Sequence, residues 1–188
     1  MKVLVVFGTR PEAIKMCPVI KKLKEKSNII CRACLTGQHE EMLNQVMETF
    51  DIKSDYNLHV MTERQTLAGV SARIMTGLQE IYEKEKPDVV LVHGDTTSSY
   101  IAAVCAFYQH IPIGHVEAGL RTYQLQSPFP EEFNRQSIDM ISDIYFAPTK
   151  LAQQQLLNEG KNAAHIYVTG NTAIDALKDT IRESYYSS

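Results

Sequence analysis

Three motifs that carry carboxylates hold the residues of this sequence best suited to chemistry. They are HGDTT at residues 93–97, HVEAGLR at residues 115–121 and SPFPEE at residues 127–132, and the first two directly follow β-like runs. If those runs are neighbouring strands of a parallel sheet, Asp95 and Glu117 lie at one edge, where open α/β folds bind ligands. Carboxyl groups with differently perturbed pKa values in one cleft can transfer protons, so the pattern indicates an enzyme.

Each acid also has a structural explanation that stays open at this point. Asp95 is followed by threonines that can cap a helix, and it could itself belong to that cap. Glu131 and Glu132 follow a proline at an expected helix start, where acids interact favourably with the helix dipole. Glu117 has fewer such explanations because it follows an apolar strand. The convergence of the acids on one rim is what favours a shared function.

His93 and His115 each precede one of these acids by two residues. On a strand, residues two apart share a face, so each histidine would lie on the side of its acid. Two histidines among three carboxylates could describe a metal site. Their spacing matches no standard ligand signature, however, and we expect no metal.

A C-x-x-C pair is formed by Cys31 and Cys34, in a run that is β-like. Residues three apart on a strand point to opposite faces, and no second C-x-x-C supplies further zinc ligands. Four cysteines are also too few for a disulfide scaffold in a chain of 188 residues. The pattern therefore predicts buried or incidental thiols.

The segment GTRPE at residues 8–12 joins the first predicted strand to the first predicted helix. Pro11 suits the first helical position, and Arg10 adds a cation to a helix start that can bind an anion. The segment holds a single glycine, so it matches neither the dinucleotide fingerprint nor the P-loop. An ordinary strand-to-helix turn explains it equally well.

Strand-like and helix-like segments alternate along the whole chain. Strands are predicted at residues 2–7, 28–35, 56–60, 88–92, 111–116, 144–147 and 166–168. Helices are predicted at residues 11–26, 39–50, 65–86, 97–109, 131–142, 149–159 and 172–183. Pro18 should kink the first helix or end an initial short turn. Strict alternation indicates a parallel sheet with helices on both faces, a doubly wound α/β fold.

Composition limits the class of partner. A chain of 188 residues with 44% hydrophobic content can bury one substantial core. The net charge of −3 and the pI near 6.1 provide no broad basic field, so we expect neither nucleic acid nor a membrane as a partner. The N-terminal apolar run is shorter than a signal-peptide core, and no segment approaches the length of a membrane span. We therefore expect a cytoplasmic protein.

Six segments in the same order resemble the non-hydrolysing UDP-N-acetylglucosamine 2-epimerases. They are GTRPEAIKM at residues 8–16, TGQH at residues 36–39, the three carboxylate motifs and VTGNTAIDAL at residues 168–177. The resemblance implies a GT-B arrangement of two Rossmann-like domains with the substrate between them. Residues 1–170 would be the Rossmann-like N-terminal domain with the catalytic carboxylates. Residues 171–188 would begin the interdomain helix, with the C-terminal UDP-binding domain absent.

The resemblance also implies an activity and roles for residues. Such enzymes interconvert UDP-N-acetylglucosamine and UDP-N-acetylmannosamine by eliminating and re-adding UDP, without NAD or metal, so no cofactor is expected. Asp95, Glu117 and Glu131 would be the catalytic groups. Arg10 and Lys15 would bind the substrate. The alternatives are a hydrolysing relative of this family and a non-catalytic nucleotide-sugar-binding domain.

The resemblance further implies partners and a regulatory site. UDP-N-acetylglucosamine would be the ligand, and a C-terminal domain, in the same protein or in a separate chain, would complete the cleft. Self-association into a homodimer could also rebuild it. A second substrate molecule would bind residues in motifs like those of Gln38, His39, Arg64 and Gln65. Acidic residues at 40 and 41, where many relatives have basic or amide residues, weaken the regulatory prediction.

Overall fold

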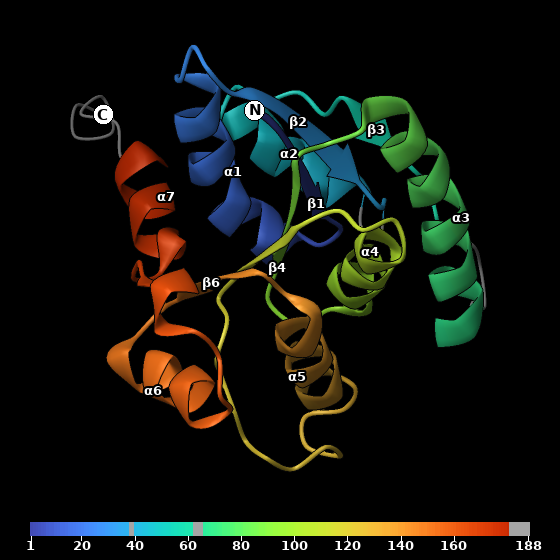
Figure 1. The fold of residues 1–188 in the computed structure, drawn as a ribbon. Coiled ribbons are helices and arrows are strands. Elements are labelled where there is room, and N and C mark those ends of the chain that lie inside the picture. Colours follow the sequence, from blue (N-terminus) through green and yellow to red (C-terminus); the bar gives the residue numbers. More distant parts are fainter. Residues whose placement is uncertain (38–39, 62–65, 181–188) are drawn as a thin grey trace.

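The computed structural model of this protein describes residues 1–37, 40–61 and 66–180. In that part of the chain, seven parallel strands form one sheet in the order β3-β2-β1-β4-β5-β6-β7 (Figure 1). The strands are β1 (Lys2–Phe7), β2 (Ile30–Leu35), β3 (Tyr56–Asn57), β4 (Val89–His93), β5 (Ile113–Val116), β6 (Ile144–Ala147) and β7 (Ile166–Val168). Every strand pair is parallel.

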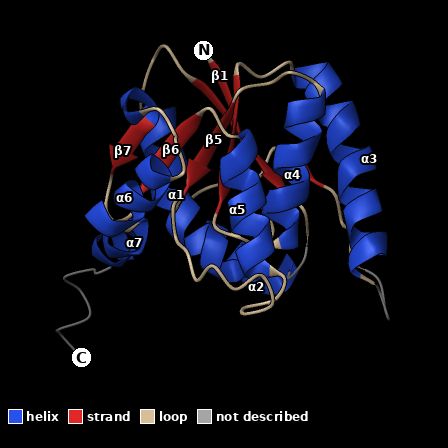
Figure 2. Cartoon of the chain, turned by 60° about the horizontal axis from the view of Figure 1, so that its bottom comes forward, coloured by secondary structure: helices blue, strands red, loops and turns tan. Residues whose placement is uncertain are grey.

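Helices connect the strands and cover both faces of the sheet (Figure 2). They are α1 (Arg10–Lys24), α2 (Glu40–Thr49), α3 (Leu67–Glu85), α4 (Thr97–Tyr108), α5 (Glu131–Ile141), α6 (Lys150–Asn158) and α7 (Thr172–Thr180), with a short 3₁₀ turn η1 (Ala163–His165) before β7. Helices α1, α2 and α7 pack on one face, and α3, α4 and α5 pack on the other. The predicted doubly wound Rossmann-like α/β fold is confirmed.

Strand β1 shows why the sheet must be covered on both sides. Its residues are apolar from Val3 to Phe7, and alternate side chains enter different cores. Val3, Val5 and Phe7 pack under α1 and α2, whereas the even-numbered residues pack under α3 and α4. A continuous apolar run of this kind is typical of a central parallel strand.

The cysteines are explained by the same alternation. All four are buried and free. Cys31 belongs to the core under α1 and α2, and Cys34 belongs to the core on the opposite face. Burial raises the pKa of Cys31 to about 11 and that of Cys34 to about 12. The prediction of buried thiols on opposite faces is confirmed.

Helix α1 continues through Pro18, so the alternative that this proline ends an initial short turn is wrong. Proline removes one backbone hydrogen bond from a helix interior. Here that loss is offset by burial, because Pro18 and the neighbouring Met16, Cys17 and Ile20 are all buried. Apolar packing on the sheet thus outweighs the local preference of the sequence.

The chain reverses its direction of travel across the sheet after β3. Helix α3 carries it from the β3 edge to β4, which pairs with β1 on the side opposite β2. In such sheets, ligands bind beyond the carboxyl ends of the strands at this switch point. No helix within the described residues is both long enough and apolar enough to cross a membrane.

Candidate active site

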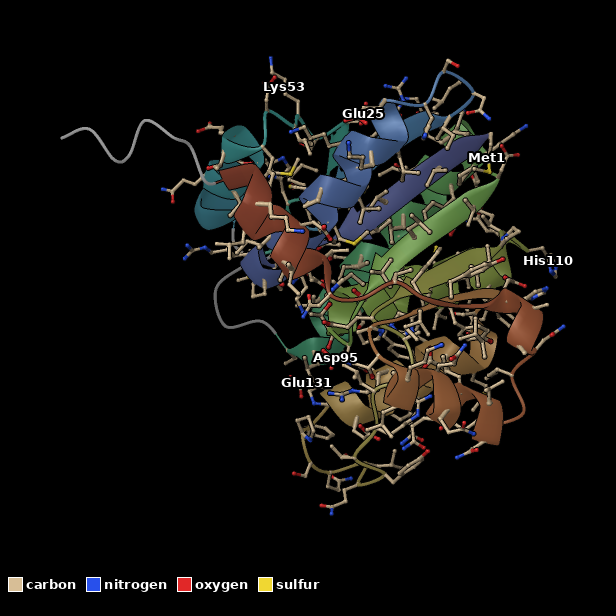
Figure 3. All side chains as sticks on the ribbon, turned by 90° about the vertical axis from the view of Figure 1, so that its left-hand side faces the viewer. Met1, Glu25, Lys53, Asp95, His110 and Glu131 are labelled. Atoms are coloured by element: carbon tan, nitrogen blue, oxygen red, sulfur yellow. The ribbon has the colours of Figure 1, made fainter. Side chains whose placement is uncertain are left out.

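The three predicted catalytic acids lie at the carboxyl ends of neighbouring elements. Asp95 follows β4, Glu117 follows β5, and these two strands pair with each other. Glu131 begins α5. Figure 3 shows Asp95 and Glu131 close together, at the end of the sheet away from Met1. The expected arrangement of two strand ends and one helix start at a common rim is therefore present.

Glu117 is held between two basic side chains from other elements. Its Oε1 lies 2.6 Å from Nζ of Lys15 on α1, and its Oε2 lies 3.5 Å from Nε2 of His93 at the end of β4. The backbone of Glu117 has a φ of 70°, in the left-handed region. A residue other than glycine in that conformation costs about 1–3 kcal/mol, and such strain is concentrated at functional sites.

Asp95 lies in a different electrostatic environment. Its Oδ2 accepts from Nη2 of Arg135 on α5 at 2.5 Å. Burial raises the pKa of this carboxyl group, Arg135 opposes that effect, and the nearby Glu131 and Glu117 add to it. The net direction is upward, so Asp95 takes up a proton more readily than an ordinary aspartate. Glu117 is thus paired with a lysine, whereas Asp95 is paired with an arginine and has a raised pKa.

The cap of α4 is formed by Thr96 and not by the Asp95 side chain. The hydroxyl oxygen of Thr96 accepts from the backbone N–H of Ser99 at 3.1 Å. The backbone carbonyl of Asp95 accepts from the side-chain amide of Asn134 at 2.8 Å. The carboxylate of Asp95 is therefore left to pair with Arg135, and the helix-cap explanation of this residue is wrong.

His93 is a neutral side chain beside Glu117. Its ring is almost completely buried, and neither ring nitrogen has a hydrogen-bond partner among the residues that the structure describes. Burial lowers the pKa of His93 to about 4; Glu12 opposes this shift, and Lys15 and His115 reinforce it. His93 is therefore uncharged near neutral pH, with a ring nitrogen directed toward the Glu117 carboxylate.

Glu12 joins the turn between β1 and α1 to the turn between β4 and α4. Its Oε2 accepts from the backbone N–H groups of Gly8 and Thr9 at 2.9 and 2.7 Å. Its Oε1 accepts from the hydroxyl groups of Thr96 and Ser99 at 2.7 and 2.8 Å. Sequence reasoning gave this residue no role, although threonine followed three residues later by glutamate is the pattern of a capping box. Glu12 thus holds together the start of α1, which carries Lys15, and the turn that carries Asp95.

Glu132 holds the loop between the second and third carboxylate motifs. Its Oε1 accepts from the backbone N–H groups of Thr122 and Tyr123 and from the side chain of Gln136, at 3.0, 2.9 and 2.7 Å. Burial raises the pKa of Glu132, but these hydrogen bonds and Arg135 hold it below its ordinary value. Two adjacent glutamates thus differ, because Glu132 anchors a loop while Glu131 begins α5 at the rim.

The predicted substrate-binding residues separate in space. Lys15 contacts Glu117, as described above. Arg10 is exposed at the start of α1 and lines a groove with Phe50 of α2 and Leu177 of α7. The predicted regulatory residues Gln38, His39, Arg64 and Gln65 all lie outside the described residues.

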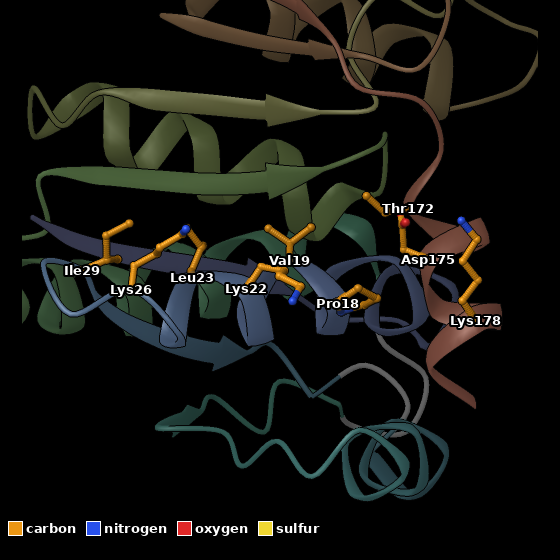
Figure 4. Close-up of a pocket in the computed structure, with 9 residues that line it drawn as sticks. All are labelled: Pro18, Val19, Lys22, Leu23, Lys26, Ile29, Thr172, Asp175 and Lys178. Carbon is orange, nitrogen blue, oxygen red and sulfur yellow. The ribbon is translucent and has the colours of Figure 1, made fainter. Parts of the chain in front are cut away.

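A groove away from the acidic rim is lined by α1 and α7. It has a volume of about 530 Å³ (Figure 4). Apolar side chains and three lysines line it, and none of the three predicted catalytic acids does. Across residues 1–37, 40–61 and 66–180, no cluster of three or more His, Cys, Asp and Glu side chains could hold a metal ion.

A family model and the curated relatives of this chain point to the same protein family. Residues 21–188 match the family model described as UDP-N-acetylglucosamine 2-epimerase. The UDP-N-acetylglucosamine 2-epimerase of Bacillus subtilis is 52% identical over 185 residues, which cover 98% of this chain and 49% of that protein. The chain spans about half the length of the curated relatives that it matches.

Solved structures agree. The UDP-N-acetylglucosamine 2-epimerase of Neisseria meningitidis, solved with UDP-GlcNAc bound, superposes with a TM-score of 0.93 at 52% identity, covering 95% of this chain and 48% of that one. A lipopolysaccharide outer core galactosyltransferase without ligand superposes with a TM-score of 0.64 at 16% identity, covering 91% of this chain and 46% of that one. The second likeness shows a shared fold alone.

Proposed function

Because the chain belongs to the UDP-N-acetylglucosamine 2-epimerase family, we propose that it forms the N-terminal half of an enzyme that interconverts UDP-N-acetylglucosamine and UDP-N-acetylmannosamine without releasing the sugar. Residues 1–170 would be the catalytic-acid domain, and residues 171–188 would begin the helix that leads to a UDP-binding domain. The observation that carries the proposal is that Asp95 and Glu117 follow two adjacent strands and that Lys15 of α1 contacts Glu117.

The reaction explains why several acids are needed. The proton on C2 of the sugar is not adjacent to a carbonyl carbon of the ring, so its direct removal leaves a poorly stabilised carbanion. If the C1–O bond to UDP breaks, oxocarbenium character develops at C1 and the C2 proton can be lost to a base. The products of that half-reaction are a glycal and UDP. Addition of UDP back to C1, with a proton delivered to the other face of C2, gives the epimer.

The environments of the acids fit a division of labour. Glu117 is paired with Lys15 at 2.6 Å, and we assign to this carboxylate the role of a base at C2. The raised pKa of Asp95 suits a group that alternates between proton donor and acceptor. Glu131 stands beside Asp95 and adds negative charge where positive charge would develop on the sugar ring.

Cations at the same rim would assist the departing diphosphate. Lys15 is close enough to Glu117 to share its charge between the carboxylate and a bound anion. Arg10 begins α1, where the backbone N–H groups of the first turn favour an anion. Its position in a groove with α7 suggests that it acts together with the segment leading to the second domain.

The test is an assay in deuterium oxide of the chain alone and of the chain supplied with a matching C-terminal domain. UDP-N-acetylglucosamine is added, and the products are separated and examined for deuterium at C2. We expect no epimer from the chain alone, because an open half-cleft leaves water to solvate charges that closure transfers to protein dipoles. We expect UDP-N-acetylmannosamine carrying deuterium at C2 when both domains are present.

Other products would support the alternatives. UDP with free N-acetylmannosamine would identify a hydrolysing enzyme, and tight binding without turnover in the two-domain protein would identify a binding module. Robust epimerisation by the isolated chain would contradict the half-site proposal, unless the rate rises faster than linearly with protein concentration. That dependence would indicate that a homodimer rebuilds the cleft.

A further inference from the structure

His115 is fully buried on β5, and both of its ring nitrogens face acceptors. Nε2 lies 2.7 Å from the backbone carbonyl oxygen of Gly94. A carbonyl oxygen can only accept, so Nε2 carries a hydrogen and donates it. Nδ1 lies 2.6 Å from Oδ1 of Asp139 on α5. The charge state of Asp139 therefore decides whether His115 carries one proton or two.

Asp139 is surrounded by donors. Its Oδ2 accepts from the backbone N–H of Gly119 at 3.0 Å and from Nη2 of Arg121 at 2.7 Å. Burial by itself raises the pKa of Asp139, but His115 and Arg121 hold it below its ordinary value. An ionised Asp139 has no proton to give, so Nδ1 of His115 must also donate. The geometry thus fits a buried imidazolium–carboxylate pair with every polar atom bonded.

Each member of this pair holds one of the two turns that carry the acids. Gly94 directly precedes Asp95, and its φ is 64°. Gly119 follows Glu117 by two residues, with φ values of 85° and 70° respectively. Glycine adopts a left-handed backbone readily, but at Glu117 that conformation persists only where surrounding contacts hold it. The contacts of His115 with Gly94 and of Asp139 with Gly119 hold the backbone of the two turns in this way.

We propose that the His115–Asp139 ion pair positions Asp95 and Glu117 for catalysis, because His115 holds the carbonyl of Gly94 while Asp139 holds the N–H of Gly119. The pair sets the distance between the two acids across the β4–β5 junction. This inference rests on the proposed function, since the groups being positioned are the proposed catalytic acids. His115 and Asp139 are positioning residues and do not themselves touch the substrate.

The first experiment needs no activity. The histidine rings of this chain are labelled with nitrogen-15, and His115→Gln identifies which signals belong to His115. We expect a proton bonded to both ring nitrogens of His115 at pH 7.5, which Asp139→Asn should convert to a single ring proton. A neutral His115 ring in the wild-type chain at this pH would overturn the ion pair.

The second experiment measures kcat and KM of a two-domain protein containing this domain, per folded molecule. Asp139→Asn and His115→Gln should each lower kcat by about 10- to 100-fold, the range for lost supporting contacts, while KM changes by less than about threefold. The double variant should have a kcat little lower than that of either single variant, because both changes remove the same ion pair. Tyr82→Phe is the matched control, because it removes another buried hydrogen bond, to the carbonyl of Ala102, and should leave kcat unchanged.

The outcomes separate the two proposals. If Asp95→Asn and Glu117→Gln abolish turnover while folded Asp139→Asn and His115→Gln keep normal kcat, positioning is overturned and the proposed function stands. If the wild-type two-domain protein forms no epimer, the proposed function fails, and the nitrogen-15 experiment still decides whether the ion pair exists. A variant that does not fold leaves the other one to decide the kinetic question.

Discussion

The ends of β4 and β5 carry the same local pattern, a histidine two residues before an acid, yet the two histidines have opposite environments. His115 has a hydrogen-bond partner at each ring nitrogen, one of them from α5. His93, on the adjacent strand, has neither nitrogen bonded in the part of the chain that is described. The hydrogen-bond partners of a buried histidine therefore come from its tertiary neighbours and not from the local sequence pattern. Asp139 and Gly94 provide partners for both ring nitrogens of His115, whereas burial lowers the pKa of His93.

The largest contrast is expected in stability. His115→Leu leaves Asp139 buried without its main partner, and breaking a buried ion pair costs about 3–5 kcal/mol. His93→Leu removes an imidazole that forms no hydrogen bond with any described residue, so its cost should be below about 1 kcal/mol. Urea unfolding followed by circular dichroism measures both values. Equal costs would contradict the contrast between the two strand ends.

The next largest effect concerns the acids that follow the two histidines. In a two-domain protein, Asp95→Asn, Glu117→Gln and Glu131→Gln should each lower turnover at least about 100-fold, the lower end for loss of general acid–base catalysis. Folding should survive in Asp95→Asn because Thr96 caps α4.

Glu25→Gln is the matched control for these acid-to-amide changes. Glu25 is exposed, pairs with Lys22 and lies well away from Asp95 in Figure 3. Its variant should have the turnover of the wild type. Near-normal turnover in any of the three rim variants would remove that residue from the mechanism.

The dependence of the free energy of unfolding on pH should reveal the lowered pKa of His93. Its pKa is lowered from 6.5 to about 4 in the folded protein, so the unfolded state takes up the proton first as the pH falls. Stability is unaffected above pH 6.5 and is lost as the pH falls from 6.5 toward 4; by pH 5 the linkage relation gives a loss of about 2 kcal/mol.

The variant His93→Leu lacks this titration and provides the comparison. The loss of stability between pH 7.5 and 5 should be smaller in that variant by about 2 kcal/mol. Asp139 has a lowered pKa, so its contribution is lost only at more acidic pH and does not interfere in this range. Identical pH profiles for the two proteins would show that His93 is not buried in its neutral form.

The smallest expected difference is in the stability cost of replacing a glycine in the turn after β4 or in the turn after β5. Among the described residues, the methyl group added in Gly94→Ala contacts only the Glu117 carboxylate, at 3.7 Å. The loss in free energy of unfolding is therefore that of a positive φ, about 1 kcal/mol. Gly119→Ala has the same backbone cost and in addition brings a methyl group to 2.3 Å from the carbonyl oxygen of Ala152. We expect thermal unfolding to show the larger loss for Gly119→Ala. The reverse order would contradict the tighter packing of the β5 turn.

Much of the fold could be predicted from local patterns. The apolar run of β1, the alternation of strands and helices and the threonines before α4 and α6 all have short-range causes. The first helix was harder, because Pro18 locally disfavours the helix that its buried neighbours stabilise. The rim position of Asp95 and Glu117 followed from the expectation that their strands are adjacent and parallel.

The roles of other site residues depended on distant parts of the chain. Asp139 meets His115 across 24 positions in the sequence, and Glu132 meets Thr122 across 10. Glu12 had a local signal as a capping-box residue, but its contacts with Thr96 and Ser99 span 84 and 87 positions. Only packing of α5 and α1 against the β4–β5 rim creates these pairs.

Local sequence was enough to predict the strand and helix types, the doubly wound α/β class and the acids at the rim. These follow from apolar periodicity and from side-chain chemistry, which act over a few residues. Packing of distant elements decides which of two similar histidines has a partner at each ring nitrogen, which of two adjacent glutamates anchors a loop and which aspartate has a raised pKa. Such properties depend on desolvation and on charges within a few ångströms, and no local pattern specifies which distant groups will supply them.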